Sequence, residues 1–465
     1  MTDPHRTRRT AVSLGAVERR AAVGLAAIFA SRMLGLFLVL PVFTLFAQAY
    51  PDYSPVLAGL AIGAYGLTQA VLQIPFGMVS DRLGRKPVIT VGLILFALGS
   101  AWSALAGSLL GVLIGRAIQG AGAISGPVLA LAADLTREEH RTKVMAVIGT
   151  SIGLSFAIAL VAGPVLGRHL GLAGLFWATA GLALAGLAIL HLYVPTPRES
   201  HVHRDAEPVA SQFGAVLRDT QLLRLDFGIL VLHFVMTGLF VALPLLLRDQ
   251  LGLPGDRHWA VYLGVLTLSV ALMVPFVVIA ERRRQIKGVF VGAVVAAMLA
   301  QLGLMLPGAG EARVYTLLVL YFAAFNVLEA TLPSLIAKVA PPQSKGTAMG
   351  VYSTAQFLGA FLGGATGGWA LGHGGPHTVF AACSAALGAW VLVAATMKTP
   401  RYLSTRLLHV GPVGAAEADA LATRLLTVTG VAEAVVIAEE GTAYLKVDRT
   451  TIDEEALAGF SAAEA

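Results

Sequence analysis

Four ionisable residues stand in stretches that are otherwise apolar: Arg32, Arg116, His233 and Glu329. A charge inside a bilayer costs about 2.5–3.5 kcal/mol on insertion scales, so such residues usually have a partner or a function. We take Glu329 as the leading proton carrier, because a desolvated carboxyl group can exchange a proton near neutral pH. A structural hydrogen bond to a neighbouring helix is the alternative role.

Three further groups are candidates for proton coupling. His233 titrates near neutral pH and could relay a proton, or it could simply pack inside the protein. Arg116 could take part in coupling or tie two helices together, and Asp134 closes the same apolar stretch. Arg32 is not a carrier, because an arginine has no accessible neutral state. It could instead hold an anionic substrate or tune an acid.

Amide side chains accompany these charges. Asn326 lies one helical turn before Glu329, and Gln69 and Gln73 are one turn apart in another stretch. Residues at this spacing share a helix face, and polar amides there either bridge helices or line a cavity. We expect the substrate cavity to be lined by Arg32, Gln69, Gln73, Gln119, Asn326 and Gln356.

The composition is that of an integral membrane protein. Of the 465 residues, 56% are hydrophobic and 13% are charged, and the mean hydropathy is +0.76. A soluble domain has about 25% charged residues, so a soluble enzyme is excluded. The single cysteine, Cys383, excludes an intrachain disulfide and a cysteine-based zinc site. We expect no enzymatic activity, no metal or other cofactor, no nucleic-acid partner and, because a Walker A motif is missing, no ATP-driven transport.

Apolar stretches recur between short breaks that are charged or rich in Pro and Gly. A spanning helix needs about 20 mostly apolar residues, and the stretches are long enough. They predict twelve spans, near residues 22–49, 55–80, 87–106, 109–135, 142–167, 172–194, 224–247, 259–281, 288–307, 312–339, 345–371 and 377–397.

The charges between the spans predict their orientation. Segments on one side carry 24 Lys and Arg residues, whereas the loops on the other side carry only Arg168, Arg248, Arg257 and Arg313. Positive charge accumulates on the cytoplasmic side of a membrane. Both termini of this multi-pass protein are therefore predicted to be cytoplasmic.

The two halves of the membrane region repeat. Residues 71–82 and 271–282 share a Leu, a Pro, a Phe and an Arg at an offset of 200, and residues 35–41 resemble residues 238–244. Because six spans is an even number, both copies cross the membrane in the same direction. This predicts two parallel six-helix repeats with the substrate path between them.

The loop between the second and third spans carries a motif. It reads GMVSDRLGRK from residue 77, and its fixed positions are Gly77, Asp81, Arg82, Gly84, Arg85 and Lys86. The loop resembles the G-x-x-x-D-[RK]-x-G-[RK]-[RK] signature of the major facilitator superfamily. An ordinary positive loop is the alternative reading.

The resemblance implies a fold and a role for the motif. The family fold has twelve transmembrane helices, and in it the residue matching Asp81 faces the positive end of a helix in the second half. The residue matching Arg85 pairs with the one matching Asp134. Both contacts are expected only when the halves are closed on the cytoplasmic side, so they favour the outward-open state.

Other elements narrow the resemblance. Arg116 and Gln119 resemble an R-x-x-Q-G element linked to proton coupling, and Gly163, Pro164 and Gly167 resemble the core of an antiporter element. Arg168 departs from that element, where a second Gly is usual. The chain is most similar to the YajR-type group of drug:proton antiporters, whose members share a small additional C-terminal domain.

After residue 397 the sequence loses its spanning character. Its pattern predicts the order β-α-β-β-α, which is a ferredoxin-like domain whose last strand is missing or supplied by another chain. We divide the chain into an N-terminal tail, a six-helix bundle, a linker, a second six-helix bundle and a cytoplasmic α+β domain, at residues 1–20, 21–195, 196–222, 223–398 and 404–465.

The sequence therefore predicts an all-α membrane protein with a small α+β domain. The leading function is a secondary transporter that exports a drug-like or metabolic compound in exchange for protons. An importer or uniporter of a small metabolite or anion is the second reading, and a transporter-derived sensor is the third. The expected partners are a small-molecule substrate, protons and lipid, and the C-terminal domain is expected to regulate or assemble the protein.

Overall fold

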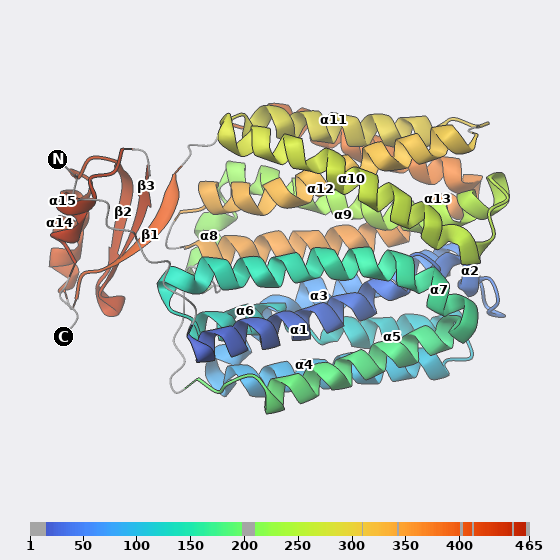
Figure 1. Ribbon diagram of the computed structural model, residues 1–465, viewed down its shortest axis with the longest axis horizontal. Coiled ribbons are helices and arrows are strands. Elements are labelled where there is room, and N and C mark those ends of the chain that lie inside the picture. Colours follow the sequence, from blue (N-terminus) through green and yellow to red (C-terminus); the bar gives the residue numbers. More distant parts are fainter. Residues whose placement is uncertain are drawn as a thin grey trace, which may run out of the picture.

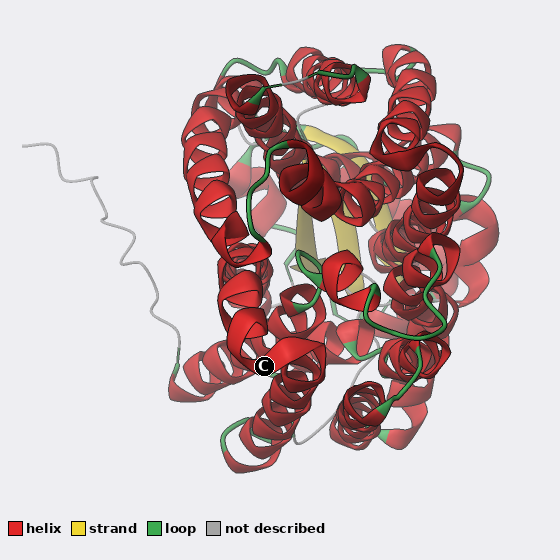
Figure 2. Cartoon of the chain, turned by 90° about the vertical axis from the view of Figure 1, so that its right-hand side faces the viewer, coloured by secondary structure: helices red, strands yellow, loops and turns green. Residues whose placement is uncertain are grey.

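The computed structural model describes residues 15–197, 210–308, 310–341, 344–399, 403–411, 413–448 and 451–461. Two bundles of long helices lie side by side, and a small domain with a sheet caps one end (Figure 1). We call the end next to this domain the tail end and the opposite end the far end. Seen along the bundle, the strands lie behind the helices (Figure 2).

The N-terminal half comprises α1 (Ala16–Leu38), α2 (Phe43–Ala47), α3 (Pro55–Leu83), α4 (Arg85–Leu105), α5 (Leu109–Ala121), α6 (Ser125–Asp134) and α7 (Glu138–Leu192). The first predicted span contains both α1 and α2, because Pro41 lies between them and cannot donate a helical hydrogen bond. The fourth span is broken between α5 and α6, where Gly122 approaches the backbone of Gly92.

The C-terminal half follows a short linker with η1 (Ala210–Gln212) and α8 (Phe213–Val216). It comprises α9 (Thr220–Leu245), the π-helical η2 (Leu246–Gln250), η3 (Gly255–Arg257), α10 (His258–Arg282), α11 (Ile286–Met305), α12 (Glu311–Val339) and α13 (Lys345–Ala395). Side chains cap the N-termini of helices in both halves. The Ser54 hydroxyl accepts from the Leu57 amide, and the Asp219 carboxylate caps α9.

The described residues contain ten helices or helix pairs that are long and apolar enough to cross a membrane. Two of them, α7 and α13, each contain two spans joined at a kink, at Gly171 and at Gly374 and Gly375. Gly171 and Gly375 have φ angles of 62° and 71°, which favour glycine. The twelve spans predicted from the sequence are therefore present.

The repeat is visible in the backbone. Pro75 lies inside α3, and its counterpart Pro275 lies inside α10. The loops that follow these helices place Gly84 and Arg284, also 200 positions apart, in the left-handed region, with φ angles of 91° and 54°. The two halves thus share helix order and a positive φ angle at the equivalent loop position, although Gly84 alone separates α3 from α4, whereas residues 283–285 separate α10 from α11.

The C-terminal domain has the predicted order. It comprises β1 (Ser404–His409), α14 (Ala415–Leu425), β2 (Val431–Ile437), η5 (Ala438–Glu440), β3 (Thr442–Val447) and α15 (Glu454–Ala458). The central strand β3 pairs antiparallel with both β1 and β2. Leu408, Leu425, Leu445 and Leu457 form its core. In a ferredoxin-like fold a fourth strand would lie beside β1.

Close packing joins the two halves toward the far end. A Cβ atom added to Gly364 of α13 would lie 2.5 Å from the carbonyl oxygen of Gly59 of α3, and one added to Gly63 would lie 2.8 Å from that of Phe361. Polar contacts at the far end also cross between the halves: Gln48 accepts from Arg248, and Arg168 pairs with Asp256 at 3.1 Å. The structure is therefore closed at its far end.

We expect Gly364→Val to open the far end, because overpacking costs about 1–3 kcal/mol and the nearest atoms belong to backbone. Spin labels on the exposed far-end residues Leu105 and Leu306 would report longer distances, in a Cys383→Ser background. Gly264→Val is the matched control, since an added Cβ there meets no atom within 4 Å. Equal distance distributions for both variants would contradict this role of the glycine packing.

Candidate functional site

The motif loop at the tail end is organised around Arg85. This buried guanidinium lies 3.2 Å from the Asp134 carboxylate at the end of α6, donates to the Ser80 hydroxyl at 2.9 Å and forms an ion pair with Asp81. Gly84 ends α3 and starts α4, so the chain reverses within one residue. The loop thus ties α3, α4 and α6 together.

The remaining motif residues have different surroundings. Lys86 donates to the carbonyl of Val194 at 2.6 Å, next to the end of α7, and Arg82 is exposed. A Cβ atom added to Gly77 would meet nothing within 4 Å. The described contacts of the motif therefore lie within the N-terminal half, and there is open space beside Gly77.

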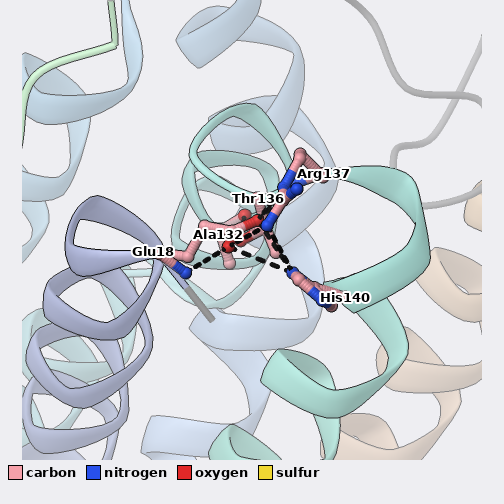
Figure 3. A network of polar contacts seen from close by, with 6 residues as sticks. Glu18, Ala132, Thr136, Arg137 and His140 are labelled. Carbon is pink, nitrogen blue, oxygen red and sulfur yellow. Dashed lines mark hydrogen bonds and ion pairs between the residues drawn. The ribbon is translucent and has the colours of Figure 1, made fainter. Parts of the chain in front are cut away.

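A second charged network supports this end of the bundle. The Glu18 carboxylate of α1 accepts from Arg137 Nε at 3.1 Å and Nη2 at 3.2 Å, and it lies 3.0 Å from His140 Nδ1 (Figure 3). Arg137 and His140 stand at the start of α7. The sequence analysis did not identify this network, because its members are more than 100 residues apart.

Two buried arginines occupy the interior of the N-terminal half. Arg32 donates to the Gln69 amide oxygen at 2.6 Å, to the Gly122 carbonyl at 3.0 Å and to the Ser125 hydroxyl at 3.3 Å. Its guanidinium also lies over the ring of Tyr65, 5.7 Å from the centroid. Arg32 and Gln69, both expected to line the substrate cavity, are thus in direct contact.

Arg116 lies on the other side of this region. It donates to the Gln119 amide oxygen at 3.0 Å and lies 5.3 Å from the Tyr65 centroid. Gln119 donates in turn to the Ser100 hydroxyl at 2.6 Å. All hydrogen-bond acceptors that the structure shows for Arg32 and Arg116 are amide, hydroxyl or carbonyl oxygens, so this half keeps two positive charges without a carboxylate neutralising them.

The C-terminal half carries acids instead. The Glu329 Oε2 atom on α12 is buried, as are both carboxylate oxygens of Asp226 on α9, and these atoms have no hydrogen-bond partner among the described residues. The buried Tyr352 lies close enough to interact electrostatically with both acids. Asp226 was not among the predicted site residues, because its place near a helix end suggested contact with water.

His233 and the amides have partners other than Glu329. The His233 ring lies between the Ile229 carbonyl, at 3.3 Å, and the Gln356 amide nitrogen, at 2.8 Å. Asn326 donates to the Ser269 hydroxyl at 3.3 Å rather than to Glu329. Both ring nitrogens are therefore occupied in this conformation, which suits an uncharged imidazole.

Gln73 bridges the two halves. Its amide nitrogen donates to the Thr354 hydroxyl of α13 at 2.8 Å. Aromatic rings also meet between the halves: Phe156 of α7 lies 6.3 Å from Phe240 and 6.2 Å from Phe325. Phe156 was missed in the sequence, where aromatic residues in spans are too common to single out.

The antiporter-like element packs α7 against the first span. A Cβ atom added to Gly163 would lie 2.4 Å from the carbonyl oxygen of Leu38, and one added to Gly167 would lie 3.0 Å from the ring of Phe46. Pro164 lies inside α7 between them. These residues permit a close helix contact near the far end.

The membrane-spanning region, its repeat and its motif can now be compared with known proteins. A model of the Major Facilitator Superfamily matches residues 25–364, which is most of the membrane region. The chain belongs to the major facilitator superfamily. A second model, the YajR YAM domain, matches residues 411–453, so the additional domain of this superfamily member is a YajR-type domain.

Relatives within the superfamily are transporters rather than enzymes. The chain is 46% identical over 434 residues to the inner membrane transport protein YajR of Escherichia coli strain K12, covering 93% of this chain and 94% of that protein. It is 26% identical over 349 residues to the multidrug resistance protein MdtH of Klebsiella pneumoniae strain 342, covering 72% and 83%. The predicted family, fold class and absence of enzymatic activity are confirmed.

Solved structures of superfamily members share the fold. The human organic anion transporter MFSD10 has a TM-score of 0.58 at 23% identity, covering 81% of this chain and 99% of that one. A bacterial homologue of the human lysosomal transporter Spinster, in an inward-facing and occupied conformation, has a TM-score of 0.66 at 14% identity, covering 82% and 96%.

We expect Asp81→Asn to shift the superfamily switch toward forms open at the tail end. The substitution removes a charge that can face a helix N-terminus of the second half when the tail end closes, whereas the Asp81–Arg85 pair is already present in this structure. A loss of about 1 kcal/mol changes a two-state population roughly fivefold. Labels at the exposed tail-end residues Leu192 and Arg283 would measure the shift.

Glu281→Gln is the matched comparison, because Glu281 is the counterpart of Asp81 in the second half. It pairs with Lys338 of α12, at 2.9 Å, within one half. Its neutralisation should leave the distances close to those of the original chain. If the distances between the labels also stay unchanged in Asp81→Asn, the charges of the loop only set the orientation of the helices in the membrane.

Proposed function

We propose that the chain is a proton-coupled exporter of drug-like or metabolic organic compounds that works by alternating access. The observation that carries this proposal is the pair of buried acids in the C-terminal half, Glu329 and Asp226. Their buried carboxylate oxygens lack described partners. A carboxylate left unpaired in a low-dielectric interior is strongly disfavoured, so a group of this kind binds and releases protons as its surroundings change.

Alternating access fits the distribution of contacts. Glycine packing and ion pairs close the far end, whereas the motif loop has open space beside Gly77. The excess of Lys and Arg in the tail-end loops assigns that end to the cytoplasm. We therefore infer that the structure is inward-facing, in an inner membrane like that of the YajR relative, with both termini in the cytoplasm. The Arg85–Asp134 pair is present in this state, so the expectation that it forms only when the cytoplasmic side is closed is wrong. The proton gradient is the energy source, and no cofactor is required.

Export of organic compounds is supported by the relatives and by the central aromatic cluster. MdtH is a multidrug resistance protein by name. Aromatic side chains such as Phe156, Phe240 and Phe325 offer large apolar surfaces with few directional demands. A site of this kind suits substrates that share hydrophobic character rather than one hydrogen-bonding pattern.

One observation favours a second candidate, the transport of an anion. Arg32 and Arg116 are buried, and their described acceptors are uncharged. An anionic substrate would provide the missing counter-charge if the cavity reached either guanidinium. Comparing anionic, neutral and cationic compounds in a thermal-shift panel would separate this candidate from a general exporter.

We expect Glu329→Gln to uncouple transport from protons while exchange continues. The amide cannot release a proton but has nearly the same size, so substrate can still bind. Proteoliposomes would be loaded with a compound found in the thermal-shift panel, and flux driven by a pH gradient would be compared with substrate exchange. Asp226→Asn, assayed in parallel, shows whether the second acid contributes.

If Glu329 is the proton carrier, the Glu329→Gln variant loses the flux driven by the pH gradient but retains substrate exchange. If Glu329→Gln keeps its full gradient-driven flux, Glu329 is not the carrier, and Asp226 or His233 takes its place. If both single variants keep that flux, proton coupling through buried acids is wrong for this chain.

The C-terminal domain is proposed to regulate or assemble the transporter. The Lys446 ammonium is almost fully buried and donates to the carbonyl of Lys338, at the end of α12. Positive charge is favoured at a helix C-terminus. The free edge of β1 offers a second surface, since a strand without a neighbour invites pairing.

We expect truncation before Ser404 to leave substrate affinity nearly unchanged and to alter either oligomer size or the salt and pH response of transport. Light scattering, binding and flux would be compared for the full-length and truncated proteins. Lys446→Met is a milder variant that removes the contact with α12 and keeps the domain. If truncation abolishes binding in a well-folded membrane region, the domain belongs to the substrate site.

A further inference from the structure

A groove of about 950 Å³ lies in the C-terminal half, outside the substrate path. Its walls are apolar: Phe276 and Ile279 come from α10, Val291 and Ala296 from α11, and Leu320 and Val327 from α12. Figure 1 shows α11 at the outer edge of the molecule, away from the N-terminal half. Phe276 and Leu320 are exposed, so the groove opens on the surface that faces lipid.

The tail end of this groove is basic. Arg284 and Lys287 line it beside the first turn of α11, where Gly288 leaves the backbone accessible. Arg282 and Arg283 precede them in the same loop, and Lys398 stands next to the lining residue Thr399. The nearby acid Glu281 is turned toward Lys338 and Ser334 of α12. Positive charge thus dominates the mouth of the groove.

Arg284 has an unusual backbone. Among the described residues it is the one non-glycine residue with a positive φ angle, 54°, and its counterpart in the first half is Gly84. The amide of Gln285 donates to the carbonyl of Ala280, as in the glycine-favouring end of a helix. An arginine therefore stands at a helix end where glycine would be relaxed. The strain is explained if the guanidinium itself is needed at this position.

We propose that this groove binds an anionic phospholipid. The acyl chains lie along α10, α11 and α12, and the phosphate is held by Arg284, Lys287 and the N-terminal turn of α11. Basic pockets between transmembrane helices bind anionic head groups, an arginine matches phosphate geometry with paired hydrogen bonds, and a helix N-terminus favours an anion. The proposal does not depend on the transported substrate.

The groove is also lined by α12, the helix that carries Glu329. Ala324 and Val327 line the groove on α12, five and two residues before Glu329. A lipid that joins α10, α11 and α12 would hold the helix that carries the proposed proton carrier. It would therefore stabilise the C-terminal half as a unit.

The test uses the purified full-length protein in detergent, with its thermal unfolding midpoint measured against added phosphatidylglycerol and phosphatidylcholine. We expect phosphatidylglycerol to stabilise the protein at lower concentrations than phosphatidylcholine. Arg284→Gly should weaken this effect about tenfold or more, because a charge-assisted hydrogen bond is lost. In the absence of lipid, the same variant should unfold at a higher temperature, because glycine relieves the backbone strain.

Arg283→Gln is the matched control, with the same loss of charge one residue away and no place in the groove wall. It should keep the phosphatidylglycerol effect. Ala296→Phe should weaken the effect by filling the groove without changing charge. Equal losses in Arg283→Gln and Arg284→Gly would show nonspecific attraction and overturn the proposal. Inorganic phosphate that protects as well as the lipid would also overturn it, since the groove would then hold no acyl chain.

Discussion

Within hydrocarbon, a polar group has to find its partner inside the protein, and the two halves of this chain meet that constraint differently. In the N-terminal half, Arg32 and Arg116 donate to amide, hydroxyl and carbonyl oxygens, although the Nε atom of each is buried without a described partner. The C-terminal half leaves buried carboxylate oxygens of Glu329 and Asp226 without described partners. A guanidinium keeps its positive charge in either environment, whereas a buried carboxyl group without a described partner is the kind of group whose charge depends on its surroundings.

Duplication explains how one architecture came to hold such different chemistry. Pro75 and Pro275 keep equivalent helices alike, and Gly84 and Arg284 keep the following turns in the same backbone region. Equivalent positions in the two halves nevertheless carry side chains with different partners. Asp81 pairs with Arg85 within its loop, whereas its counterpart Glu281 reaches Lys338 on α12. The same turn thus serves a switch in one half and a basic groove in the other.

The sequence was most informative where structure is set locally. Apolar stretches and Pro or Gly breaks predicted twelve spans, and alternation with turn residues predicted the β-α-β-β-α domain, because both depend on neighbours along the chain. The Glu18 network and the Phe156 cluster could not be predicted, because they join residues far apart in sequence. The amides show the same limit: helical spacing placed Asn326 beside Glu329, but Ser269 of another helix is its partner. Which of the predicted residues carry protons or substrate is a question that spacing alone does not answer.

The contacts at the two ends of the bundle differ in kind: those at the far end join the two halves, whereas the described contacts of the motif loop at the tail end lie within the N-terminal half. At the far end, backbone meets backbone at Gly59 and Gly364, a contact that depends on shape and is indifferent to salt. At the tail end, the motif loop relies on charges, with Arg85 held between Asp81 and Asp134. Ion pairs weaken when they are exposed to solvent and salt, whereas buried ones are screened much less. Burial of Arg85 therefore protects the charged contacts of the motif loop from the ionic strength of the surroundings, whereas the glycine contact at the far end depends on shape.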